Sequence, residues 1–292
     1  MTSRLTLILL FNILILKESV AKESALESCN DAVYHRQYSQ AVKLAEQHAS
    51  QAEFWLCKGR AQSALNENAS AEASFKQAIA LKPDGLDLIS AYMLLGSVQQ
   101  ESKNASEALA SYRQALKLSE QQNMRRYTRI AHNLIGEAMY ENGQHAESLQ
   151  AFEAGEKLAM NDDERADSYI HEAMAYHQLQ QTDKAIEYQL KGVLMLRKSG
   201  TPDQYAEASL ALGKLFVAKK DYMGAEKTYQ RLIDYARENG GSFYEAKTMI
   251  YLAEVKKLNG DPTAATQLVK QAQSMAGEIK DPELDELLAK FN

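Results

Sequence analysis

Small side chains recur along this chain at a spacing typical of paired helices. From Cys29 onwards, a small residue is followed twelve positions later by a second small residue, and this happens seven times. The seven pairs are Cys29/Ala41, Gly59/Ala71, Gly96/Ala108, Gly136/Ser148, Ala173/Ala185, Gly213/Ala225 and Ala253/Ala265. Two antiparallel helices joined by a short turn approach closely only where neither carries a bulky side chain. The constant offset therefore predicts seven helix hairpins with the same turn.

The second hairpin carries the most complete set of pattern residues, which are Trp55, Gly59, Ala71, Phe75, Ala78 and Pro83. They resemble the tetratricopeptide repeat (TPR) pattern W-x2-L-G-x2-Y…A-x3-F…P, a helix-turn-helix unit of about 34 residues. Lys58 and Gln62 depart from that pattern. The small first-helix residues lie 30, 37, 40, 37, 40 and 40 positions apart. Most repeats are thus similar to the long variety of about 40 residues, as in kinesin light chains and bacterial peptide-sensing regulators.

The resemblance implies an all-α fold, an α-solenoid of about seven TPR-like hairpins with a C-terminal capping helix. The expected solenoid covers 22–292, with hairpins near 22–50, 52–85, 89–122, 124–160, 163–198, 203–239 and 243–277. The cap is expected at 281–291, where Leu284, Leu287, Leu288 and Phe291 form one apolar helix face. Such a face is what a terminal repeat needs; a partner-binding helix is the alternative.

Polar residues at the turns predict how the second helices begin. Ser70, Ser106, Thr182, Asp221 and Asp261 occupy or adjoin these turns, and Ser, Thr and Asp are favoured N-caps. Pro262 then fits the first helical position.

The N-terminus has the pattern of a secretory signal. Arg4 precedes an apolar run from Leu5 to Leu16, and Ser19-Val20-Ala21 offers small residues for cleavage. The twelve-residue run is shorter than the roughly 20 residues of a membrane span. We therefore expect a signal peptide over 1–21 and an exported, periplasmic protein with no stable membrane span. A membrane anchor formed by an uncleaved N-terminus is the alternative, because Lys17 and Glu18 are unusually charged for this position.

Composition narrows the function classes. Only 4 Pro and 14 Gly occur in 292 residues, and 45% of the residues are hydrophobic, as expected for a helical globular protein. The net charge of −6 argues against a nucleic-acid partner. There is no G-x-S-x-G, glycine-rich phosphate loop, H-E-x-x-H or C-x-x-C motif. We therefore expect no enzyme activity, no catalytic residue and no cofactor.

The two cysteines, and a group of two histidines and a methionine, each allow more than one interpretation. Cys29 and Cys57 lie on the first helices of consecutive hairpins, so they either form a disulfide or remain two small buried thiols. The small-residue position of Cys29 favours the thiols. His171, Met174 and His177 lie on one expected helix. The two histidines would lie about 9 Å apart along the axis and about 120° apart around it. That geometry favours a polar recognition patch over a metal site.

The resemblance also implies a concave groove lined by the second, fifth, ninth and twelfth positions of each first helix. These positions include Leu56, Arg60, Met93, Ser97, Asn133, Glu137, Ile170, Met174, His177, Leu210, Lys214, Ile250 and Glu254. Apolar residues dominate the fifth position, and charges surround them, as in peptide or helix recognition. Of the Lys and Asn residues with which chaperone-type TPR domains grip a terminal carboxylate, only Asn133 is matched.

We expect a scaffold that binds a peptide or helix of a partner protein, in an envelope or secretion assembly. The alternative is an extracytoplasmic sensor that binds a peptide or small ligand and acts on a separate signalling partner. A groove filled by the protein's own termini, and a homodimer through a terminal hairpin, also stay open.

Overall fold

The structure, a computed structural model, describes residues 23–291 and places almost all of them in helices. The expected all-α solenoid class is confirmed. The helices divide into two compact units, with the boundary between Asn142 and Gly143. The sequence predicted one continuous stack, so this division inside the fourth expected hairpin is a finding of the structure. The expected leader 1–21 lies outside the described residues.

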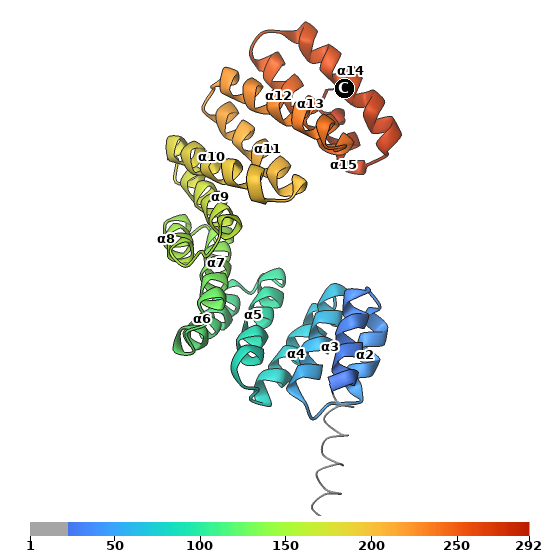
Figure 1. The fold of residues 1–292 in the computed structure, drawn as a ribbon, viewed down its shortest axis with the longest axis vertical. Helices are drawn as coiled ribbons and strands as arrows, with labels where there is room; N and C mark the ends of the chain where they lie inside the picture. The colour runs from blue at the N-terminus through green and yellow to red at the C-terminus, as the bar shows by residue number, and fades with distance from the viewer. Residues whose placement is uncertain (1–22, 292) are drawn as a thin grey trace, which may run out of the picture. The chain divides into compact units, whose positions relative to one another are not determined.

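The first unit begins with helical residues 23–34. Its further helices are α2 (Tyr38–Glu46), α3 (Ala52–Ala64), α4 (Asn68–Ala80), α5 (Gly85–Glu101), α6 (Ala105–Gln121) and α7 (Arg125–Glu141). From α2 on, each helix packs on the next one in chain order (Figure 1). The first helices of neighbouring hairpins also meet, since α5 contacts both α3 and α7. This alternate contact is what stacked hairpins produce.

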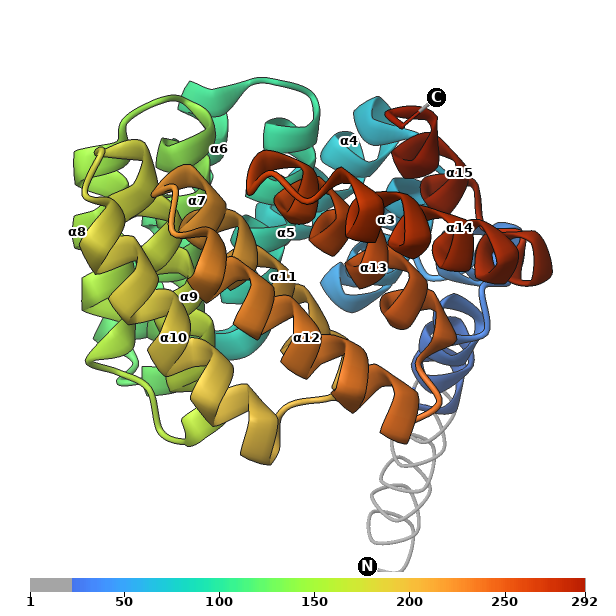
Figure 2. The ribbon, with the colours of Figure 1, turned by 90° about the horizontal axis from the view of Figure 1, so that it is seen from above.

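The second unit repeats that arrangement. Its helices are α8 (His145–Glu156), α9 (Asp162–Gln178), α10 (Thr182–Ser199), α11 (Pro202–Ala218), α12 (Tyr222–Glu238), α13 (Ser242–Leu258), α14 (Pro262–Ile279) and α15 (Pro282–Ala289). Neighbours in the chain again pack on one another, and α13 also contacts α11 and α15 (Figure 2). The short α15 buries Leu284, Leu287 and Leu288 against the unit. It therefore covers the end of the stack, as expected of a cap.

The small first-helix residues leave room for an aromatic ring. A Cβ atom added at Gly59, Gly96 or Gly213 would overlap the ring of Phe75, Tyr112 or Tyr229, respectively. In each case the ring lies sixteen residues after the glycine, on the second helix of the same hairpin. All three rings are buried, with exposed fractions of 1% or less. Close packing of ring against glycine thus holds the two helices of a hairpin at a fixed distance.

The hairpin turns share one backbone conformation. Seven positions after each small first-helix residue stands a residue with positive φ. These residues are Arg36, Asn66, Lys103, Gly143, Gln180, Lys220 and Gly260. Five of the seven are not glycine, which makes this turn hard to detect from residue type. The left-handed residue ends the first helix and reverses the chain into the second.

The predicted N-caps are confirmed at two turns and wrong at the others. The side chains of Asp221 and Asp261 accept hydrogen bonds from the backbone N–H groups of Gly224 and Ala264. Pro262 takes the first helical position of α14. At α4, α6 and α10 the residue before the helix is Glu67, Asn104 or Gln181 and makes no side-chain cap hydrogen bond. The Ser and Thr residues instead lie inside those helices, because the left-handed residue sets where the second helix begins.

Cys29 and Cys57 form a disulfide bond across the first two hairpins. Their Cα atoms are 6.4 Å apart, inside the roughly 7 Å that a disulfide can span. Both residues are fully buried beside Ala41 and Phe54. The interpretation as two free thiols is therefore wrong. A small-residue position accommodates half of a disulfide as readily as a thiol.

Candidate functional site

The structure sorts the thirteen predicted groove residues by exposure. Leu56, Met93, Asn133, Leu210 and Ile250 are buried, with exposed fractions between 1% and 8%. Arg60, Ser97, Glu137, Ile170 and His177 are half-buried, and Met174, Lys214 and Glu254 are exposed. Four of the five apolar fifth positions therefore pack between helices and leave little surface for a partner. The expected row of exposed apolar anchors is replaced by separate pockets.

In the first unit, predicted groove residues are tied to internal contacts. The Ser97 hydroxyl donates to the carbonyl of Met93 and receives a hydrogen bond from the Tyr112 hydroxyl at 3.3 Å. Burial raises the pKa of Tyr112 to about 12. Burial lowers the pKa of Arg60, and the nearby Asp87 opposes that shift. These side chains stabilise the hairpins as well as bordering the face of the first helices.

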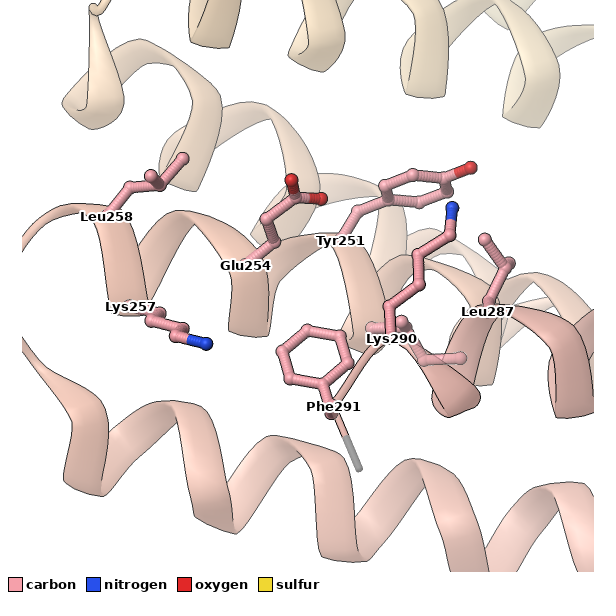
Figure 3. Close-up of a pocket in the computed structure, with 8 residues that line it drawn as sticks. Tyr251, Glu254, Lys257, Leu258, Leu287, Lys290 and Phe291 are labelled. Atoms are coloured by element: carbon pink, nitrogen blue, oxygen red, sulfur yellow. The ribbon is translucent and has the colours of Figure 1, made fainter.

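In the second unit, a pocket opens between α13 and α15, which we call the α13–α15 pocket. It has a volume of about 250 Å³, and its lining residues are Ile250, Tyr251, Glu254, Lys257, Leu258, Leu287, Lys290 and Phe291. Figure 3 shows Leu287 and the Phe291 ring from the chain end facing Tyr251 and Glu254 of α13. Two predicted groove residues, Ile250 and Glu254, therefore belong to one apolar cavity with charged margins.

A second cavity, the α9–α11 pocket, has a volume of about 270 Å³. Its lining residues are Asp163, Asp167, Ile170, Gln189, Leu196, Gln204, Glu207, Ala208 and Ala211. Leu196 and Ala208 are buried, and the buried amide of Gln189 donates to the carbonyl of Ala208 at 2.9 Å. Three carboxylates border this apolar base. The predicted groove residue Ile170 thus lies in an acidic cavity.

Lys247 holds the first helices of the second unit together. Its ammonium group lies 2.8 Å from Glu207 of α11 and 2.9 Å from Glu283 of α15, and it also lies over the Phe243 ring. Burial alone would lower the pKa of Lys247, but the two carboxylates outweigh it and raise that pKa. Lys247 occupies the second position of its repeat, one of the positions expected to face the groove.

The His171 and Met174 side chains differ in their surroundings. The His171 ring stacks on Phe152 at 4.8 Å, and its Nδ1 lies 3.6 Å from Asp167. Met174 is 42% exposed. Within residues 23–291, no three His, Cys, Asp or Glu side chains are grouped as a metal site would need. In the same range, no helix combines the length and apolar character of a membrane span.

Glu172 is a buried acid that sequence reasoning missed. It is 3% exposed and stands where the repeat pattern has leucine, one residue before the small Ala173. Burial, and then the carboxylates of Glu153 and Glu156, raise its pKa to about 7. The departure from leucine was the available signal. The acids of the α9–α11 pocket gave no such signal, because each looks like an ordinary surface residue.

Comparisons with known proteins agree with this repeat architecture. A family model described as "Tetratricopeptide repeat" matches residues 52–84, 89–122 and 166–195. No curated protein sequence matches the chain.

Solved structures of low identity share the fold. The apo form of RapI matches with a TM-score of 0.73 at 14% identity, over 91% of this chain and 79% of that one. A signal transduction ATPase with a tetratricopeptide repeat sensor, from Pyrococcus horikoshii, matches with a TM-score of 0.73 at 21% identity. That match covers 92% of this chain and 44% of the ATPase. The pilF protein of Pseudomonas aeruginosa matches with a TM-score of 0.57 at 18% identity, over 84% and 98% of the two chains. This chain therefore carries tetratricopeptide repeats within an all-α solenoid fold.

Proposed function

We propose that this protein is a non-catalytic scaffold that binds a segment of a partner protein along its first helices. The observation that carries the proposal is the pair of cavities in the second unit. Each has first-helix residues in its lining and combines an apolar base with charged margins. Apolar pockets within a polar rim are the usual anchor sites of peptide recognition. Tetratricopeptide repeats generally mediate protein–protein interaction, which supports the same conclusion.

A site-specific photo-crosslinking experiment tests this binding face. A photoreactive amino acid is placed at Met174 or Leu258, which are 42% and 49% exposed on first helices. Met223, 80% exposed at the start of the second helix α12, is the matched control. We expect partner adducts from Met174 and Leu258 in the native host, and none from Met223. Equal adducts from Met223, or none from the first-helix positions, would contradict the proposal.

We also propose that the scaffold works outside the cytoplasm, in an envelope or secretion assembly. The Cys29–Cys57 disulfide supports export, because disulfides persist mainly in oxidising compartments. The apolar N-terminal run is the expected leader. The intact mass of the protein from its native host tests this. An N-terminus at Lys22 supports cleavage after Ala21, whereas a retained Met1 supports the anchored alternative.

A sensor role is the second candidate, favoured by the likeness to an ATPase whose repeats are described as a sensor. In that case the cavities bind a peptide or small ligand, and the output belongs to a separate signalling partner. A sensor should capture a small peptide that raises its melting temperature, and the crosslinks at Met174 and Leu258 should then change with that peptide.

A further inference from the structure

In the second unit, side chains from several helices bind the ammonium group of Lys247. Lys247 of α13 reaches back one repeat to Glu207 of α11, forty residues earlier in the chain. Its ammonium is also paired with Glu283 and lies over the rings of Phe243 and Tyr244. The Lys247 side chain is only 8% exposed. This arrangement is an occupied cation site between two successive first helices.

The preceding pair of first helices, α9 and α11, has an acid at the position equivalent to Glu207 but no lysine at the position equivalent to Lys247. Forty residues before Glu207, the equivalent position of α9 is Asp167, so Asp167 corresponds to Glu207. Forty residues before Lys247, the equivalent position of α11 is Glu207 itself, an acid where the next repeat has lysine. Asp167 and Glu207 both line the α9–α11 pocket. The cavity therefore lies where the repeat next to it places an ammonium group.

The space in the α9–α11 pocket also comes from a difference between equivalent residues of successive repeats. Tyr251 of α13 corresponds to Ala211 of α11, which lines the cavity. In α13 the Tyr251 ring packs on Tyr229, and the Lys214 ammonium lies 4.6 Å from the centre of the Tyr251 ring. Alanine in place of that ring leaves space on α11. Ala208, beside it in the lining, is also small.

The charges around the cavity favour a cation from outside. Asp163, Asp167 and Glu207 border it, and none of the nine described lining residues is Lys or Arg. Lys247 pairs with Glu207 and also with Glu283, and the His171 ring nitrogen lies 3.6 Å from Asp167. A single lysine cannot neutralise three carboxylates. The local field therefore attracts a further positive group.

We propose that the α9–α11 pocket binds a lysine or arginine side chain of the partner segment, in the place where the next repeat holds its own Lys247. The apolar base of Ile170, Leu196 and Ala211 accepts the aliphatic stem, and Asp163 and Asp167 bind the charged head. This inference rests on the proposed function, since it names the chemistry of the bound segment.

A peptide-pool experiment tests the inference. The full chain is immobilised and offered four pools of acetylated, amidated nine-residue peptides with random flanks. The central residue is fixed as arginine, lysine, citrulline or glutamine. Citrulline keeps the shape of arginine without its charge. We expect about tenfold enrichment of the arginine or lysine pool over the citrulline pool, the size expected for one charge-assisted contact.

Three variants, each verified by circular dichroism, locate the effect. Asp163→Asn combined with Asp167→Asn should remove the enrichment, because both charges on α9 are lost. Ala211→Tyr should remove it without changing any charge, because the added ring takes up space in the cavity that Ala211 lines. Glu238→Gln, an exposed acid at the end of α12, should leave it unchanged.

The outcomes separate this inference from the proposed function. Equal binding of arginine and citrulline pools leaves a peptide-binding scaffold and overturns the cation site. Enrichment that survives both pocket variants places the cation elsewhere and also overturns it. If no pool binds while Met174 and Leu258 still crosslink a partner, the cation site fails alone. If the crosslinks are absent as well, both proposals fail.

Discussion

Glu172 allows a quantitative test of how this fold tolerates a buried charge. The ordinary pKa of the carboxyl is 4.5, and burial together with Glu153 and Glu156 raises it to about 7 in the folded state. The difference of about 2.5 units corresponds to about 3 kcal/mol of unfolding free energy, at about 1.36 kcal/mol per unit. Because the pKa is raised, folding favours the protonated acid. The contribution of protonated Glu172 to the free energy of unfolding is fully present below about pH 4.5. It falls as the pH rises and is lost above about pH 7.

The perturbation is Glu172→Gln, which keeps the size of the side chain and removes its titration. At pH 8 we expect the variant to be more stable than the natural protein by about 3 kcal/mol, and at pH 5 by less than about 1 kcal/mol. The groups facing Glu172 include Glu153 and Glu156 of α8, Lys157 directly after that helix, and Lys191 of α10. They stay in place in both proteins. Comparing the variant with the natural protein at each pH therefore cancels most of their own titration.

The assay must report on α8 to α10, since repeat arrays can unfold region by region. Hydrogen exchange of peptides from 145–199 provides this, with protection factors corrected for the intrinsic rate at each pH. Glu187→Gln, which removes an exposed acid paired with Lys191 on α10, is the control and should change protection little at either pH. A gain for Glu172→Gln that is equal at pH 5 and pH 8 would refute the reasoning, because an untitrated group cannot cause pH dependence.

Four further variants act on other parts of the fold. Replacing Cys29 and Cys57 together by alanine should cost about 3.5 kcal/mol of first-unit stability, by chain entropy over the 28-residue separation. Hydrogen exchange of 23–64 should then no longer respond to dithiothreitol, and a persisting response would contradict the bond. Lys247→Met keeps the apolar stem and removes both ion pairs; it should loosen α15 by about 1 kcal/mol, seen as faster exchange of 282–289 and no change at 23–64. Gly260→Ala, at φ 85° in open space, should destabilise the unit by about 1 kcal/mol in urea denaturation. Lys220→Gly, at φ 62° in the equivalent turn, should shift the midpoint the opposite way, and shifts of the same sign would contradict the shared turn.

The interior of the repeats could be predicted from sequence because it depends on side-chain volume. The offset between small residues and the rings that follow them fixes which positions meet, and volume can be read from residue type. The turns were less predictable. Their left-handed residue is Arg36, Lys103 or Gln180 at some repeats and glycine at others. Backbone position in the hairpin, and not residue preference, selects that conformation.

The binding face could be predicted only in outline. The resemblance pointed to the first helices, whose residues line both pockets of the second unit, but it treated the fifth position as an exposed anchor. Leu210 is 1% exposed because it packs in the core of the second unit. Ile170, at the same position of α9, lines a cavity instead. Whether a fifth-position side chain is buried depends on how closely neighbouring hairpins pack, and that spacing follows from contacts between repeats that a single-repeat pattern does not contain.

The positions that indicate where a pocket forms are thus those where equivalent residues of successive repeats differ. The repeat frame gives Asp167, Glu207 and Lys247 similar backbone settings, so a change of residue type at this position becomes a change in local charge. One acid is neutralised by a lysine of the next repeat, and the earlier one faces a cavity bordered by further acid. The same logic applies to Tyr251 and Ala211, where loss of a ring becomes a gain of space. A repeat protein can therefore acquire a specific pocket through two or three substitutions at equivalent positions, while its buried glycine-ring contacts keep the hairpins unchanged.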